Sequence, residues 1–178
     1  SSSSVYGANK KLPFAEIDKT ESQLSIYAAT KKSTESIAHS YSNIWKTPIT
    51  MLRFFTVYGP WGRPDMAPMK FAKLIMENKE IDVFNNGNMK RDFTYIDDVV
   101  KAVIKCSLKF PECNSKFNFS NPDPSSSFAP HLILNIGNSE PINLVEFINI
   151  LESYLGKKAI KKFRPMQEGD VFETFSDT

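Results

Sequence analysis

The sequence predicts an α/β fold built on a parallel sheet, and two strands and one helix carry that prediction. Residues 49–57 are mostly branched or aromatic and nearly all apolar, which is typical of a central parallel strand covered on both faces. Residues 132–136 form a second apolar strand, which ends in a glycine and an asparagine. Residues 25–45 carry apolar side chains at three- and four-residue steps, which predicts an amphipathic helix.

The bulk composition excludes several classes of partner. The chain has 178 residues, enough for one domain with a hydrophobic core. Its formal net charge is only +2, and the four lysines within residues 157–162 are interleaved with apolar residues, as on a solvated strand face. We therefore expect no nucleic acid as a partner. No stretch approaches the roughly 18 apolar residues of a membrane span, so we expect no membrane partner either.

The two cysteines, Cys106 and Cys113, lack the spacing of a zinc site. We therefore expect no bound metal. Two cysteines without a disulfide pattern fit a reducing compartment, which predicts a cytoplasmic protein.

The first half of the chain follows these elements in order. Residues 1–7 resemble the exit of a parallel strand into a loop, and the polar residues 9–22 continue that loop. After the helix and the apolar strand, residues 61–66 form a loop that leads into a short helix at 71–76. Residues 80–84 then predict a short strand.

In the second half of the chain, helix caps and turn residues predict the elements. Asp97 is placed to N-cap a helix whose apolar positions run to Leu108. Residues 111–130 are rich in Ser, Asn, Asp and Pro, which predicts a surface loop. Asn143 has the spacing of a capping box at the start of the last helix, and Gly156 is placed at its C-cap.

Tyr27 lies four residues before Lys31 within the first predicted helix. Residues at this spacing share one helix face, so both side chains can reach one bound molecule. The spacing is also common by chance, and a half-buried tyrosine beside a solvated lysine is the alternative. Lys32, Glu35 and His39 fall between the apolar positions of this helix.

Three motifs in chain order resemble one known family. They are the serine cluster within residues 1–7, the YxxxK helix, and the RxFxVYGP sequence at residues 53–60. Together they resemble the extended short-chain dehydrogenase/reductase family, and within it the nucleotide-sugar epimerases and dehydratases. Residues 90–98 come close to the RDFxYxDD signature of the same family.

The resemblance implies a division of the chain. Residues 1–58 would be the C-terminal part of a Rossmann-type parallel sheet that binds NAD, and residues 59–178 mainly a smaller α/β substrate-binding domain. Parts of 92–110 and 132–137 are expected to pack back on the Rossmann sheet. The Gly-rich NAD turn of the family is not found in the sequence. We therefore expect this chain to be the C-terminal portion of a longer protein and inactive alone.

The resemblance also implies catalytic roles. Tyr27 matches the base that takes the proton from a sugar hydroxyl, and Lys31 matches the residue that favours the phenolate and binds the nicotinamide ribose of NAD. Ser2 matches the position that hydrogen-bonds the substrate oxygen, and Ser4 a second polar position near the sugar. The dehydratases tend to carry Asp and Glu where this chain has Ser3 and Ser4, which counts against dehydration.

A threonine and an arginine point to the substrate. Thr56, together with the Trp-Gly-Arg-Pro-Asp-Met sequence around Arg63, is similar to the UDP-glucuronate 4-epimerase branch. A hydroxyl and a guanidinium suit the carboxylate of a hexuronate, because Arg can bind a carboxylate through two nitrogens. The alternative for Arg63 is a surface position without a ligand.

Further positions match the nucleotide-binding residues of the family. The resemblance places uracil near Val83 and Phe84, and the pyrophosphate beside Arg91. Asp170 matches a ribose contact. Gln167 stands where the family has an arginine, which leaves a second phosphate contact from this segment open.

The reaction implied is an NAD-dependent epimerisation at C4 of a UDP-sugar, from UDP-glucuronate to UDP-galacturonate, through a 4-keto intermediate. Another UDP-hexose 4-epimerase, or an enzyme like UDP-glucuronate decarboxylase, is the alternative within the enzyme class. A catalytically inactive nucleotide-sugar-binding fragment is the alternative outside it. The family's habit of pairing the YxxxK helix across subunits implies a homodimer.

Overall fold

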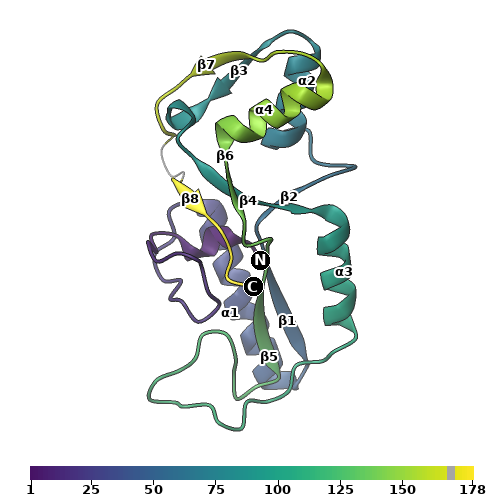
Figure 1. Cartoon of the computed structure of the whole chain (residues 1–178). Helices are drawn as coiled ribbons and strands as arrows, with labels where there is room; N and C mark the ends of the chain where they lie inside the picture. The colour runs from purple at the N-terminus through teal and green to yellow at the C-terminus, as the bar shows by residue number, and fades with distance from the viewer. Residues whose placement is uncertain (168–170) are drawn as a thin grey trace.

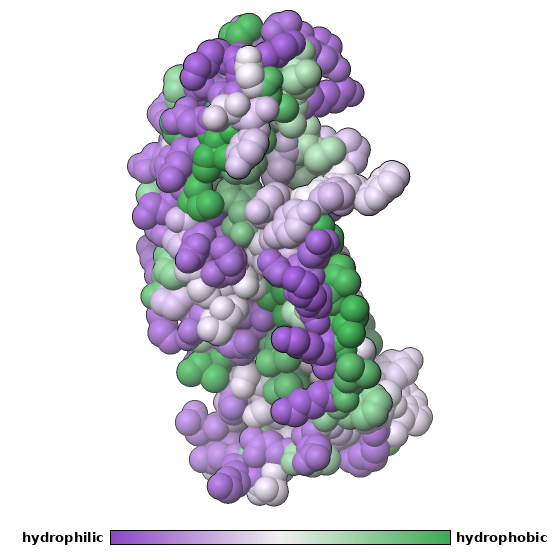
Figure 2. Space-filling model, turned by 45° about the vertical axis from the view of Figure 1, so that its right-hand side comes forward, coloured by the Kyte–Doolittle hydropathy of each residue, from purple (hydrophilic) through white to green (hydrophobic). Residues whose placement is uncertain are grey.

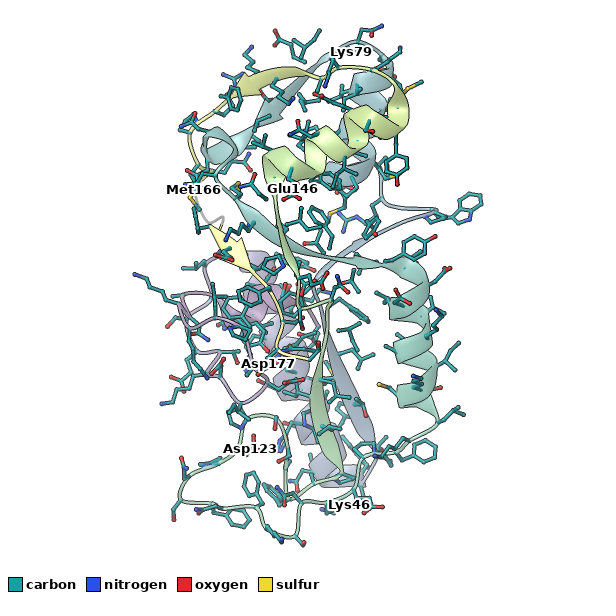
Figure 3. The ribbon with its side chains drawn as sticks, viewed as in Figure 1. Lys46, Lys79, Asp123, Glu146, Met166 and Asp177 are labelled. Atoms are coloured by element: carbon teal, nitrogen blue, oxygen red, sulfur yellow. The ribbon has the colours of Figure 1, made fainter. Side chains whose placement is uncertain are left out.

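The computed structural model describes residues 1–167 and 171–178 and has the α/β fold with parallel strands that the sequence predicts. The molecule is elongated, with a lower and an upper group of elements (Figure 1). Lys46 lies at the lower end and Lys79 at the upper end (Figure 3). The lower group consists of η1 (Ser3–Tyr6), α1 (Ile26–Trp45), β1 (Ile49–Phe54), α3 (Ile96–Ser107) and β5 (His131–Ile136).

The upper group and the strands that connect it to the lower group follow. The upper group consists of α2 (Ala67–Met76), β3 (Glu80–Val83), η2 (Phe84–Gly87), α4 (Leu144–Leu155) and β7 (Ile160–Phe163). The connecting strands are β2 (Thr56–Tyr58), β4 (Lys90–Tyr95), β6 (Pro141–Asn143) and β8 (Glu173–Thr174). β4 pairs with all three of the others, so it is the strand that joins the two groups.

The predicted helix over residues 25–45 is confirmed as α1. Ser25 is its N-cap, and the Ser25 side chain accepts a hydrogen bond from the Ala28 amide at 3.1 Å. The helix turns an unexpected face to the sheet, however. Glu35 and Ser42 are buried, whereas Ile37 and Trp45 are more than half exposed. Glu35 faces the lower strands because it binds Arg53 there, whereas the Ser42 hydroxyl is buried without a hydrogen-bond partner among the described residues.

The strand predicted over residues 49–57 is wrong as a single element. β1 ends at Phe54, and β2 begins at Thr56 in a different sheet. β1 pairs in parallel with β5, whereas β2 pairs in parallel with β4. Phe55 marks the change, because its amide still donates to Ile136 of the lower sheet at 3.1 Å. The change of sheet after Phe54 therefore places Thr56 between the lower and the upper group.

Residues 1–7 lie next to the end of β1. Ser2 forms a parallel bridge with Phe54, and the chain then turns through η1. This is the position of a strand end that enters a loop, as the sequence predicts. The buried ring of Tyr6 stacks on Phe14 at a centroid distance of 4.5 Å, which packs the following loop against η1.

The upper group encloses its own hydrophobic core. The buried core residues come from α2, β3, β4 and α4, namely Phe71, Ile75, Ile81, Val83, Phe93, Phe147 and Ile148. The expected caps of α4 are confirmed. The Asn143 side chain accepts from the Val145 amide at 2.8 Å, and Gly156 ends the helix with φ of 62°.

Two further predictions have different outcomes. Asp97 as an N-cap is wrong, because α3 begins at Ile96 and its N-cap is Tyr95. Asp97 and Asp98 lie in the first turn instead, where carboxylates favour the positive end of the helix dipole. The loop over residues 111–130 is confirmed, since it contains no helix or strand.

Apolar side chains also reach the surface. Figure 2 shows green apolar atoms down the lower half of the molecule, beside purple polar ones. Large exposed apolar residues lie on both lower helices, including Ile37, Tyr41, Ile44 and Trp45 on α1, and Val100, Val103 and Ile104 on α3. Within the described part of the chain, no helix combines the length and the apolar character needed to cross a membrane.

Candidate active site

One cavity of about 780 Å³ brings together six of the predicted site residues. It lies where the start of the chain, α1, β2 and the loop over residues 59–66 meet. The six are Ser2, Ser4, Tyr27, Lys31, Thr56 and Arg63. These positions span more than sixty residues of sequence, so their convergence is a result of the fold. We call this space the reaction cavity.

Tyr27 and Lys31 lie on one face of α1, as the four-residue spacing predicts. The Lys31 ammonium lies 5.5 Å from the centroid of the Tyr27 ring. Tyr27 is 52 % exposed, so its side chain is open to a ligand in the cavity. Across residues 1–167 and 171–178, no carboxylate lies within ion-pair distance of the Lys31 ammonium. A tyrosine hydroxyl, together with an ammonium that has no carboxylate partner among the described residues, can hydrogen-bond the hydroxyls of a ribose and of a sugar.

Ser2 and Ser4 contact each other. The Ser2 hydroxyl accepts a hydrogen bond from the Ser4 amide at 3.2 Å and donates to the Ser4 hydroxyl at 3.3 Å. The Ser2 side chain thus caps η1 and is held at the edge of the reaction cavity. Each hydroxyl retains lone pairs for a ligand.

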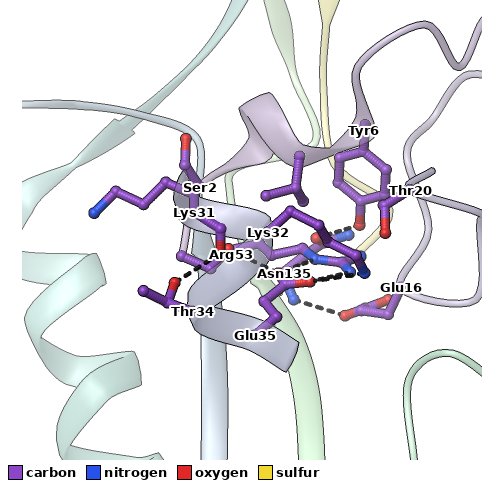
Figure 4. Close-up of polar contacts among 12 residues, drawn as sticks. Ser2, Tyr6, Glu16, Thr20, Lys31, Lys32, Thr34, Glu35, Arg53 and Asn135 are labelled. Atoms are coloured by element: carbon purple, nitrogen blue, oxygen red, sulfur yellow. Dashed lines mark hydrogen bonds and ion pairs between the residues drawn. The ribbon is translucent and has the colours of Figure 1, made fainter. Parts of the chain in front are cut away.

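A buried ion pair fastens the Tyr27 helix to the sheet. The guanidinium of Arg53 on β1 binds the Glu35 carboxylate on α1 through two nitrogens, at 2.9 and 3.0 Å (Figure 4). Both side chains are at least 97 % buried. Glu35 lies one helical turn beyond Lys31, so the pair holds the segment of α1 that carries Tyr27 and Lys31 in place.

The surroundings of this pair extend across the lower group. The Ser1 hydroxyl donates to Glu35 at 2.7 Å, and the Arg53 guanidinium lies 4.8 Å from the centroid of the Tyr6 ring. The Tyr6 hydroxyl donates in turn to Asn135 of β5 at 2.7 Å. These contacts tie the serine segment, α1, β1 and β5 together (Figure 4).

Electrostatics keep this pair charged. Burial by itself raises the pKa of Glu35, but hydrogen bonds and the charge of Arg53 outweigh it, and the pKa ends below its ordinary value. Burial opposes the charge of Arg53 in the same way, and Glu35 still raises the pKa of Arg53. Arg53 therefore has a structural role.

A second cavity, of about 320 Å³, lies in the upper group. We call it the upper cavity. Of the predicted substrate residues, it is lined by Thr56, Phe84 and Arg91. Thr56 also lines the reaction cavity, so this side chain lies where the two cavities meet. Arg91 also lines a smaller space of about 180 Å³ with Ser4 and Thr56, which adjoins both.

The other predicted nucleotide residues have different positions. The Val83 side chain is fully buried in the upper core and lines none of these cavities. The Val83 carbonyl accepts from the Arg164 amide at 2.9 Å. Asp170 lies outside the described residues.

Sequence reasoning overlooked several residues that line these cavities. Lys70 and Asp82 line the upper cavity. They come from separate elements, α2 and β3, so no spacing in the sequence groups them. The same cavity is lined by Gln167, which stands where the family has an arginine, and by Asp65, which belongs to the motif around Arg63 but had no predicted role. The Glu35–Arg53 pair did have a signal, since a lone arginine in an apolar strand needs a buried carboxylate nearby. Among the described residues, no cluster of His, Cys, Asp and Glu could hold a metal ion.

Comparison with known proteins gives matches over almost the whole chain. The model of the family described as "NAD dependent epimerase/dehydratase family" matches residues 1–120. Protein CapI of Staphylococcus aureus is 52 % identical over 177 residues, which are 99 % of this chain and 53 % of CapI. A probable UDP-glucuronate 4-epimerase of Rhizobium meliloti is 48 % identical over 99 % of this chain and 52 % of its own length.

A solved structure is similar over the same extent. It is the UDP-glucuronic acid 4-epimerase of Bacillus cereus in complex with UDP-glucuronic acid and NAD. The TM-score is 0.81 and the identity 36 %, over 99 % of this chain and 51 % of that one. The chain thus spans about half the length of the relatives that it matches.

Proposed function

The chain belongs to the NAD dependent epimerase/dehydratase family, and we propose that it supplies the catalytic tyrosine and the sugar-nucleotide site of an NAD-dependent UDP-glucuronate 4-epimerase. The observation that carries the proposal is the reaction cavity. A tyrosine, a lysine, two serines, a threonine and an arginine line one space. The names of the Rhizobium meliloti and Bacillus cereus relatives support the same reaction.

The first chemical task falls to Tyr27. As a phenolate, it takes the proton from the C4 hydroxyl of the sugar and returns a proton to the C4 oxygen when the epimer forms. The Lys31 ammonium stabilises the phenolate, since it lies over the Tyr27 ring and has no carboxylate partner among the described residues. Ser2 orients the sugar hydroxyl, and Ser4 holds Ser2 in place.

NAD fits the same residues. Lys31 and Tyr27 present an ammonium and a phenol at one cavity wall, a donor set suited to the nicotinamide ribose. When bound, NAD supplies the hydride acceptor and donor for the C4 carbon, so that the sugar passes through a 4-keto form. The protein contributes position and charge.

The upper cavity is suited to the nucleotide. Arg91 can bind the diphosphate, because guanidinium groups bind phosphate oxygens strongly. Its own Nη1 donates to the Phe172 carbonyl at 3.3 Å, which holds the arginine against the β8 segment. Phe84 offers an aromatic side chain to the uracil. Thr56 lines both cavities, which supports a position for it between the sugar and the diphosphate.

Replacing Tyr27 tests the reaction. In the full-length protein, Tyr27→Phe should reduce turnover of UDP-glucuronate by about 10²- to 10⁴-fold, because the proton acceptor is lost. UDP-glucuronate binding should persist, which calorimetry can measure. Tyr154→Phe is the matched control, since Tyr154 is exposed on α4 and lines no cavity described above. Near-normal turnover of the Tyr27 variant would remove the assignment.

The NAD proposal has a separate readout. Full-length protein should carry NAD after purification, detectable by absorbance after denaturation, whereas the 178-residue chain should carry none. Lys31→Met in the full-length protein should reduce the NAD content. NAD bound to the 178-residue chain by itself would show that these residues suffice for the cofactor site.

A second copy of the chain is the partner that we propose. The exposed side of α1 carries Ile37, Tyr41, Ile44 and Trp45, which supports a helix-to-helix contact between subunits. Full-length protein should elute as a dimer from gel filtration. Ile44→Lys should yield a monomer with unchanged far-ultraviolet circular dichroism, and a dimeric Ile44→Lys protein would place the interface elsewhere.

A further inference from the structure

Arg63, the residue proposed to bind the sugar carboxylate, already binds a carboxylate of its own chain. Its Nε lies 3.1 Å from Asp65 Oδ1, and its Nη2 lies 2.5 Å from Asp65 Oδ2. Both side chains are exposed, at 71 % and 62 %. This two-point contact is the one that an arginine would make with a hexuronate.

The loop between β2 and α2 holds the two residues at a fixed spacing. The Met66 amide donates to the Arg63 carbonyl at 3.2 Å, which closes a turn over residues 63–66. Pro64 occupies the second position of that turn, where its fixed φ suits the backbone. The turn thus sets Asp65 beside the Arg63 guanidinium.

The two side chains face different spaces. Arg63 lines the reaction cavity with Tyr27 and Ser2, where the sugar is expected. Asp65 lines the upper cavity, and Thr56 lines both. The guanidinium therefore lies at the boundary, with Asp65 on the nucleotide side and the reacting sugar on the other. Because both side chains are exposed, the guanidinium has room to turn from one carboxylate to the other.

We propose that Asp65 occupies Arg63 as a stand-in for the sugar carboxylate and is exchanged for it when a hexuronate binds, so that Asp65 limits how strongly the site prefers hexuronates over neutral hexoses. The inference rests on the proposed function, because it assumes a UDP-hexuronate in the reaction cavity. Asp65 then costs a hexuronate some affinity. A neutral hexose loses nothing, because it leaves the Arg63–Asp65 pair intact.

The cost must be small, because the pair is exposed. Ion pairs between solvated side chains contribute little, and water solvates either partner when they separate. The pairing with Asp65 keeps the pKa of Arg63 above its ordinary value, so the arginine stays charged for either carboxylate. A competing carboxylate of this strength lowers hexuronate affinity by about two- to fivefold.

The test is a double-mutant cycle in the full-length protein, with dissociation constants for UDP-glucuronate and UDP-glucose measured by calorimetry. Asp65→Asn should tighten UDP-glucuronate binding by about two- to fivefold and leave UDP-glucose unchanged. Arg63→Met should weaken UDP-glucuronate by about tenfold or more. Once Arg63 is Met, adding Asp65→Asn should have no further effect on UDP-glucuronate.

Each other outcome contradicts a specific step. Tightening by Asp65→Asn that persists beside Arg63→Met would mean that Asp65 only repels the sugar carboxylate, which overturns the exchange. Unchanged or weaker UDP-glucuronate binding in Asp65→Asn would also overturn it. If Arg63→Met leaves UDP-glucuronate binding unaffected, the role of Arg63 in the proposed function fails, and the exchange fails with it.

A matched control excludes a general effect of charge. Asp98 is an exposed aspartate paired with Lys101 at 3.1 Å on α3, and it lines none of the cavities described above. Asp98→Asn removes the same charge from the surface. It should leave both dissociation constants unchanged. A twofold tightening of UDP-glucuronate in this control would assign the effect of Asp65→Asn to net charge and overturn the exchange.

Discussion

Arg53 and Arg63 each bind one carboxylate through two nitrogens, yet they lie in opposite environments. Arg53 and Glu35 are buried between β1 and α1, with contacts of 2.9 and 3.0 Å. Arg63 and Asp65 are mostly exposed on the loop after β2, although their two contacts also lie within hydrogen-bond distance, at 3.1 and 2.5 Å. Contact geometry alone does not distinguish the two pairs.

Burial separates their roles. Removing one partner from a buried pair leaves a charge without compensation, which costs about 3–5 kcal/mol. An exposed pair contributes about 0–1 kcal/mol, because water replaces the lost partner. The Arg53 pair can therefore fasten the helix that carries Tyr27 and Lys31. The Arg63 pair is weak enough to change partners, as the proposed exchange with a sugar carboxylate requires.

The largest expected effect is on stability. In the full-length protein, Arg53→Met should lower the free energy of unfolding by about 3 kcal/mol or more, because Glu35 stays buried without its main partner. Arg63→Met, the same substitution at an exposed site, should lower it by less than about 0.5 kcal/mol. Urea unfolding measures both. Equal losses would show that burial does not distinguish the pairs.

Removing both buried charges should restore most of that loss. Glu35→Met combined with Arg53→Met leaves no buried charge, and apolar replacements of a buried pair are often neutral in stability. The double variant should thus be more stable than Arg53→Met alone by about 2 kcal/mol or more. A double variant as unstable as the single one would mean that the pair itself, and not the orphaned charge, accounts for the stability.

A pH titration tests how burial affects another titratable side chain of the lower group, His131 on β5. Burial lowers the pKa of His131 from 6.5 to about 4, with a further contribution from His39, whose ring centroid lies 5.2 Å away. Glu35 and Lys32 are the other charges that act on His131, and they act in opposite directions. The folded state therefore binds this proton less readily than the unfolded state does.

Stability should consequently fall as the pH drops below 6.5, by up to about 1.4 kcal/mol per pH unit and about 3 kcal/mol in total by pH 4. Above pH 6.5 both states are neutral at this residue, and the effect vanishes. His131→Phe should remove this slope between pH 6.5 and 5, where few carboxylates titrate. An unchanged slope in His131→Phe would assign it to other groups.

The smallest expected effect on stability is at the exposed Arg63–Asp65 pair. Asp65→Asn should change the free energy of unfolding by less than about 0.5 kcal/mol, since both side chains are solvated. Raising the salt concentration from 0.05 to about 0.5 M should weaken this pair further and leave the Arg53 pair unaffected, because salt screens exposed charges far more than buried ones. A loss above 1 kcal/mol in Asp65→Asn would show that the loop depends on the pair for its fold.

Some features of the molecule follow from sequence alone, because they depend on neighbours within a few residues. Ser25 caps α1, Asn143 caps α4, and Gly156 ends α4, as local capping rules predict. The four-residue spacing of Tyr27 and Lys31 likewise determines that they share a helix face. The motifs around them identify the family.

The tertiary structure decided what local patterns cannot express. The apolar run over residues 49–57 looks like one strand, yet β1 and β2 pair with partners more than thirty residues apart, β5 and β4. The polar side of α1 faces inward because Arg53 is there to bind Glu35. Which arginine is buried and which is exposed also depends on distant segments. Desolvation, which decides whether an ion pair is permanent or exchangeable, is therefore a property of the fold and not of the sequence motif.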